Sequence, residues 1–193
     1  MSNFPRLLVL HGNDEFAMAE RVKALKGQLD PSSADFNITE LDGGQVSLTT
    51  VRQAADAMPF LGAVRLVVAH GWLTGQLGRG KSASDENEAL LAYLAQLPDW
   101  ACLVLVEPQA LDERSKLTKA INALPGGQVV RCDVQVGADL VRWIQQRAKA
   151  LGGEFQPKAA LALAEAVGNE PRSLTNEIEK LLAYVNYARV VES

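Results

Sequence analysis

The sequence predicts an α/β protein with a five-stranded, doubly wound parallel sheet, followed by a small domain made only of helices. Two observations support this fold class. Short apolar runs alternate with segments of helical period as far as Cys132, an order typical of a parallel sheet covered by helices on both faces. After Val136, strand-like runs stop and three helical segments follow. We therefore divide the chain into domains at residues 1–135 and 136–193.

The strands are expected in five apolar or alternating segments. These are Arg6–Leu10, Phe36–Leu41, Val64–Ala69, Ala101–Val106 and Gln128–Cys132. Val64–Ala69 and Ala101–Val106 suit the centre of the sheet, since strands buried on both faces are apolar throughout. Phe36–Leu41 alternates apolar and polar residues, as a half-buried or edge strand does.

Helical periods fill the intervals between the expected strands and the whole of the second domain. The expected helices are Glu15–Leu29, Ser47–Ala57, Asp85–Leu97, Asp112–Leu124, Ala138–Leu151, Pro157–Val167 and Pro171–Tyr187. Ser47 and Asp85 are residue types that cap helix N-termini, and Gly152 follows the first helix of the second domain as a typical C-terminal signal.

The composition argues against several classes of protein. The formal net charge is −4 and no basic stripe of the kind found in DNA-binding proteins is present, so we expect no strong direct contact with DNA. No signal peptide and no apolar run of ~18 residues is found, which predicts a cytoplasmic protein without a membrane span. Cys102 and Cys132 are expected in the core, and with only two histidines no metal site is expected.

The turn after the first strand bears on nucleotide binding. A strand, a turn at His11-Gly12-Asn13 and a helix are how nucleotide-binding α/β domains begin, with phosphate held at the helix N-terminus. Here the helix opens with Asp14 and Glu15. Carboxylates suit a helix N-terminus, but they take the place of a phosphate and repel one. The nucleotide site is therefore expected to be degenerate, with no bound cofactor.

A complete phosphate-loop motif, Gly75–Ser82, occurs elsewhere in the chain, so an active NTPase using Lys81 and Ser82 is one alternative function. The motif requires a loop that leaves a strand directly and a helix that starts at the lysine. Five residues separate the expected strand from Gly75, and the next helix is expected only at Asp85. We interpret Gly71–Ser84 as a surface loop.

Catalytic machinery for phosphoryl transfer is also not evident in the sequence. Glu107 stands alone at the end of its expected strand, where a carboxylate is typically solvated. Phosphoryl transfer requires both a lysine and magnesium ligands in place. We therefore predict no catalytic residues.

Large apolar residues occupy the loop between the second helix and the third strand, with the sequence Met58-Pro59-Phe60-Leu61. Pro59 is expected to end the helix, because the residue before a proline disfavours helical geometry. The apolar side chains either fold back onto the core or insert into a pocket of a partner. Burying three such side chains yields about 5–9 kcal/mol before the costs of association.

Several stretches, in order along nearly the whole chain, resemble the delta subunit family of the bacterial DNA polymerase III clamp loader. They are Leu8–Phe16, Phe36–Gly43, Met58–Gly62, Arg65–Val68, Leu111–Leu117, Leu140–Ile144, Gly168–Leu174 and Asn176–Leu181. The resemblance implies an AAA+-like fold with a degenerate nucleotide site. It also implies a subunit that is not catalytic by itself, within the polymerase III holoenzyme, a nucleotidyltransferase complex.

The resemblance further implies that the protein binds and opens the sliding clamp (the beta subunit) during DNA replication. The other clamp-loader subunits would be its partners, and it would reach DNA indirectly through the complex. By position, the clamp-binding residues are Met58, Pro59, Phe60 and Leu61. Family members carry a third, helical collar domain that this chain is expected to lack. An inactive AAA+-like module that binds another protein is the second alternative.

Overall fold

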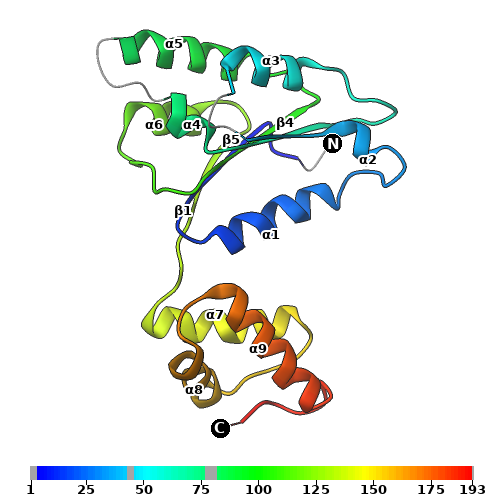
Figure 1. Cartoon of the computed structure of the whole chain (residues 1–193), viewed down its shortest axis with the longest axis vertical. Helices are drawn as coiled ribbons and strands as arrows, with labels where there is room; N and C mark the ends of the chain where they lie inside the picture. Colours follow the sequence, from blue (N-terminus) through cyan, green and yellow to red (C-terminus); the bar gives the residue numbers. More distant parts are fainter. Residues whose placement is uncertain (1–3, 43–45, 77–81, 193) are drawn as a thin grey trace. The chain divides into compact units, whose positions relative to one another are not determined.

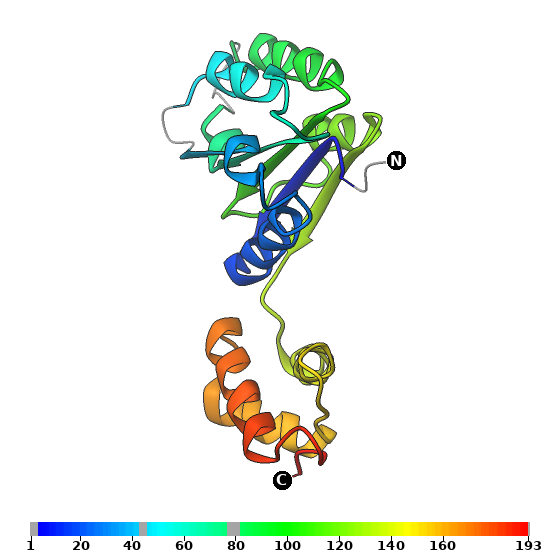
Figure 2. The same ribbon diagram turned by 90° about the vertical axis from the view of Figure 1, so that its right-hand side faces the viewer.

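The computed structural model describes residues 4–42, 46–76 and 82–192. The chain forms two compact units, Met1–Cys132 and Asp133–Ser193, which are drawn in Figures 1 and 2. The first unit is an α/β layer structure and the second contains helices. Each unit has its own hydrophobic core.

The first unit is built on a five-stranded sheet in which every strand pair is parallel. The strands are β1 (Leu7–Gly12), β2 (Ile38–Asp42), β3 (Arg65–His70), β4 (Ala101–Glu107) and β5 (Gly127–Cys132). Their order is β2-β3-β4-β1-β5. The predicted parallel sheet is therefore confirmed, with β2 at an edge and β3 and β4 in the interior, as their sequences indicate.

Alternate residues of the buried strands face two separate cores, which is the side-chain period expected of a strand. One core contains Leu7, Val9 and Leu103 of the sheet. It is covered by α3 (Leu48–Asp56), α4 (Trp72–Gln76), α5 (Ser82–Ala95) and α6 (Lys116–Ala123). The other contains Leu8 and Leu10 and is covered by α1 (Glu15–Lys26). Figure 1 shows α1 on the opposite side of the sheet from α3 and α5.

Sequence-based expectations about where some elements begin are wrong. Phe36 and Asn37 do not begin a strand; they end the short helix α2 (Ala34–Asn37), and β2 starts at Ile38. The expected loop at Gly71–Ser84 contains α4, and α5 begins at Ser82 rather than at Asp85. The helix expected to begin at Asp112 begins at Lys116, with Ser115 as its N-cap. Asn37 and Leu73 take part in tertiary hydrogen bonds, with Phe60 and Glu107, that a local pattern does not reveal.

The fully buried carboxylate of Glu107 explains why a helix follows β3. Its Oε1 accepts a hydrogen bond from the backbone N–H of Leu73 at 2.7 Å. Its Oε2 accepts from the N–H and the hydroxyl of Thr74 at 3.1 and 2.5 Å. The expectation of a solvated Glu107 is therefore wrong, because this side chain satisfies the free amides of the first turn of α4. The same turn places Trp72 in the core, with its indole N–H donating to the carbonyl of Val46 at 2.9 Å.

The second unit packs three helices around one core. They are α7 (Gly137–Ala150), α8 (Pro157–Val167) and α9 (Pro171–Tyr184). Proline stands at the start of α8 and of α9, where its missing N–H costs no intrahelical bond. A Cβ at Gly153 would lie 2.3 Å from Leu182 Cδ2, so the α7–α8 turn approaches α9 too closely for a side chain.

Both cysteines are buried in the core, as predicted. Burial raises the pKa of the Cys102 thiol to about 12, which leaves it unreactive at neutral pH. Within the described ranges, no helix is long and apolar enough to cross a membrane.

We expect Glu107→Ala to lower the free energy of unfolding by about 3 kcal/mol, because the buried amide of Leu73 and the part-buried amide of Thr74 lose their acceptor. Urea unfolding monitored by circular dichroism measures this change. Glu107→Gln is the matched control, since it keeps the shape and one acceptor oxygen, and its loss should be smaller. Wild-type stability in Glu107→Ala would contradict this role for Glu107.

Candidate protein-binding site

The loop between α3 and β3 presents a cluster of apolar side chains to solvent, which we call the apolar tip (Met58, Phe60 and Leu61). Their exposed fractions are 77%, 54% and 81%. Helix α3 ends at Asp56, and Pro59 lies half-buried in the loop. Of the two readings of this segment, folding back onto the core is therefore wrong, and a solvent-facing tip is observed.

A buried asparagine fixes the backbone of the tip. The Phe60 N–H donates to Asn37 Oδ1 at 2.6 Å, and Asn37 Nδ2 donates to the Phe60 carbonyl at 2.8 Å. Asn37 is buried, so its amide would be left without these partners away from water, which makes loss of the bonds costly. A Cβ at Gly62 would lie 3.0 Å from Asn37 Nδ2, so the chain after the tip leaves little room for a larger residue.

Arg65, the first residue of β3, joins three elements behind the tip. Its Nε donates to the Ala54 carbonyl in α3 at 3.2 Å, and its Nη2 donates to Thr39 Oγ1 in β2 at 2.7 Å. Its Nη1 donates to the carbonyl of Phe36 in α2. The planar guanidinium has enough donors to make all three bonds at once. The ends of α2, α3 and β2 are thereby held together.

Leu61 adopts an unfavourable backbone conformation at the most exposed point of the tip. Its φ is +49°, in the left-handed region that costs a residue with a side chain about 1 kcal/mol. A glycine would avoid this cost. The strain falls on a leucine whose side chain is 81% exposed and contributes little to the core.

Phe36 lies beside the tip, a position that the sequence pattern did not predict. Its ring centroid is 5.3 Å from that of Phe60, with the planes inclined at 58°, and its exposed fraction is 63%. The alternation of Phe36–Leu41 placed this residue on a strand. The signal that could have found it is Asn37, since asparagine is disfavoured in strands.

The turn between β1 and α1, where the sequence predicts a degenerate nucleotide site, is short and acidic. Asn13 and Asp14 alone separate β1 from α1. Asp14 caps α1, its buried carboxylate accepting from the Ala17 N–H at 2.8 Å, and Glu15 is the first helical residue. Behind the turn, buried His11 accepts at Nδ1 from the Leu111 N–H at 3.1 Å. A carboxylate and a two-residue turn thus stand where a phosphate loop would be.

The phosphate-loop sequence Gly75–Ser82 does not meet one structural requirement of the motif, that a loop leave the strand directly. Its first glycine, Gly75, belongs to α4, so no loop leads directly from β3 to the motif. Lys81 lies outside the described residues, and Ser82 begins α5. Among the residues that the structure describes, no group of three or more His, Cys, Asp or Glu side chains could hold a metal ion.

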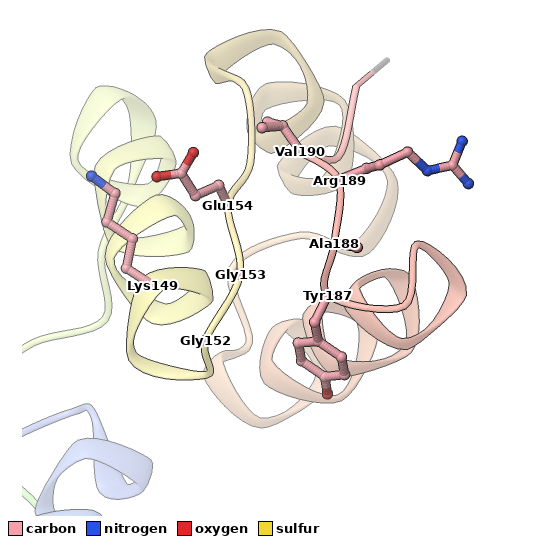
Figure 3. A pocket seen from close by; sticks show the side chains of 8 residues that line it. All are labelled: Lys149, Gly152, Gly153, Glu154, Tyr187, Ala188, Arg189 and Val190. Atoms are coloured by element: carbon pink, nitrogen blue, oxygen red, sulfur yellow. The ribbon is translucent and has the colours of Figure 1, made fainter.

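The helical unit contains an open pocket between the α7–α8 turn and the segment after α9 (Figure 3). Lys149, Glu154, Tyr187 and Arg189 contribute side chains to its lining. In Figure 3 the guanidinium of Arg189 extends away from Lys149 and Glu154. Arg189 therefore does not converge with the other two charged groups of this pocket.

Comparison with known proteins gives consistent results. A curated DNA polymerase III subunit delta from Bacillus subtilis (strain 168) is 31% identical over 116 residues, which are 58% of this chain and 33% of that protein. The solved structure of the Bacillus subtilis DNA clamp loader delta protein (YqeN) superposes with a TM-score of 0.79 at 25% identity. That match covers 96% of this chain and 55% of the other.

The chain thus spans about a third of the curated relative and about half of the solved structure. The structural match confirms the predicted AAA+-like α/β fold followed by a helical region. The family model for the DNA polymerase III delta subunit matches residues 8–133, a segment that makes up more than half of the chain and includes the apolar tip. The chain therefore belongs to the family of DNA polymerase III delta subunits.

Proposed function

We propose that this protein binds and opens the sliding clamp in the cytoplasm during DNA replication, using Met58, Phe60 and Leu61 as contact residues and Pro59 to shape their loop. The observation that carries the proposal is the exposed apolar tip on a loop whose backbone is fixed by Asn37. Membership of the delta subunit family supports the sliding clamp as the proposed partner. The other clamp-loader subunits are the remaining proposed partners, and DNA is reached through them.

The physical basis of binding is burial of the tip in an apolar pocket of the clamp. Each side chain gains about 1.5–3 kcal/mol when it leaves water. Association normally loses part of this gain to the ordering of loops. Here the hydrogen bonds of Asn37 and Arg65 order the loop before binding. Small central clusters of this kind dominate the energetics of many interfaces.

We further propose that the subunit does not hydrolyse nucleotide. Asp14 occupies the N-terminus of α1, and a phosphate brought there would be repelled by its carboxylate and by Glu15. Binding of the clamp would then depend on contacts made by this chain and not on a nucleotide that it holds.

The double variant Phe60→Ala/Leu61→Ala should bind purified sliding clamp from the same organism about 100-fold more weakly, since two central contacts are lost. Calorimetry measures the affinity, and coelution on a sizing column reports complex formation. The matched control, Leu161→Ala/Tyr184→Ala, removes two exposed apolar side chains of the helical unit and should bind like the wild type. Unchanged affinity in the tip variant, or independent elution of the wild type and the clamp, would refute the proposal.

Leu61→Gly should separate stability from binding. We expect the free energy of unfolding to stay level or rise by about 1 kcal/mol, because glycine accepts the positive φ, while clamp affinity falls about tenfold. Thermal unfolding and calorimetry measure the two quantities. Leu161→Gly, in the middle of α8, is the control and should lose about 1 kcal/mol. A parallel loss of stability and binding in Leu61→Gly would speak against a functional origin of the strain.

Titration of the protein with magnesium and ATP should give no saturable heat, and Lys81→Ala should behave like the wild type. The reasons are the capped N-terminus of α1 and the helical position of Gly75. Saturable micromolar binding that Lys81→Ala abolishes would instead favour an active NTPase.

A further inference from the structure

We infer that Phe36 is a fourth contact residue of the clamp-binding surface, so that two separate segments of the chain, α2 and the α3–β3 loop, bind the partner together. This inference rests on the proposed function and extends it to a residue outside the loop. The partner remains the apolar pocket of the sliding clamp that receives the tip.

The ring of Phe36 lies against the ring of Phe60. Phe36 and Phe60 pack with their centroids 5.3 Å apart and their planes inclined, in the range of favourable edge-to-face contacts. Both rings nevertheless keep more than half of their surface exposed. A partner that covers Phe60 therefore meets the ring of Phe36 at the same place, and one apolar surface extends from Phe36 to Leu61.

Hydrogen bonds of Asn37 and Arg65 hold the backbone segments that carry the two rings. Asn37, the neighbour of Phe36 in α2, makes both of its tip bonds to the backbone of Phe60. Arg65 donates to the carbonyl of Phe36 and to that of Ala54 in α3. The relative position of Phe36 and Phe60 is thus set in the free protein, and binding need not order it.

Phe36 is exposed as part of a contiguous apolar group. Single exposed apolar residues are ordinary on protein surfaces, and contiguous groups mark interaction sites. Phe36 belongs to the second kind, because it touches a ring of the tip. Aromatic residues also carry much of the binding energy at protein interfaces.

The first test is the affinity of Phe36→Ala for purified sliding clamp from the same organism. We expect about tenfold weaker binding with an unchanged thermal unfolding curve, since the side chain is largely exposed. Tyr184→Ala is the matched control, because Tyr184 is an aromatic residue of the helical unit with an exposed fraction of 85%, and it should bind like the wild type.

The second test observes the ring itself in the full chain of otherwise wild-type sequence. The protein is labelled with 4-fluorophenylalanine, which reports on five phenylalanines, and Phe36→Leu and Phe60→Leu assign the two fluorine resonances. Addition of the clamp should shift or broaden both. Phe155, buried in the helical unit, is the internal control and should not respond.

The outcomes separate the two proposals. A response at Phe60 without one at Phe36, together with wild-type affinity of Phe36→Ala, overturns the role of Phe36 and leaves the tip as the binding site. No response at either ring and no binding by the wild type overturn both. The inference is supported if both rings respond and Phe36→Ala binds the clamp more weakly while Tyr184→Ala binds it like the wild type.

Discussion

The rest of the site depends on the side-chain amide of Asn37. This amide donates to the backbone carbonyl of Phe60 and accepts from the backbone N–H of the same residue. A buried amide must satisfy its donor and its acceptor, and here the tip backbone supplies both partners. That pairing fixes the loop, and the fixed loop holds Leu61 in its left-handed conformation and Phe60 against Phe36. The apolar side chains are therefore held in one arrangement by a rigid support. The conformational entropy of the loop is lost when the protein folds, so binding does not lose it again.

A second feature of the scaffold is that its own carboxylates accept hydrogen bonds from the free amides at the start of two helices. Asp14 caps α1 at the end of β1, and Glu107 caps α4 at the end of β4. Ligands of open α/β sheets bind outside the carboxyl ends of the strands, which is where both side chains lie. Each carboxylate contributes to the stability of its helix and takes up amides that an anion would need. Both carboxylates thus stabilise the fold by satisfying helix amides.

The sequence predicted the parallel sheet, both core cysteines, the acidic cap of α1 and the residues of the tip, because each follows from a local pattern or a short-range rule. Apolar runs define buried strands wherever they pair, and Pro59 limits α3 without help from distant residues. Phe36, Asn37, Glu107 and α4 were not predicted correctly. Their conformations depend on partners 23 and 34 residues away in sequence, and no period or propensity encodes such a contact. Exposure of the tip belongs to the same group, since composition alone left it open.

An exposed apolar surface is a hazard for any free subunit, and the neighbouring sheet edge limits that hazard. Strand β2 is an edge strand, and open edges can pair with other chains. Lys26 and Glu40 form an ion pair of 2.6 Å there, with His70 at 3.7 Å from the same carboxylate. The hydrogen bond from Lys26 lowers the pKa of Glu40, so the carboxylate stays charged under mildly acidic conditions. Charge at the edge discourages strand pairing, and the apolar surface is confined to four side chains around one loop. A partner with a matching pocket can then bind it, while charge at the edge beside it disfavours strand pairing.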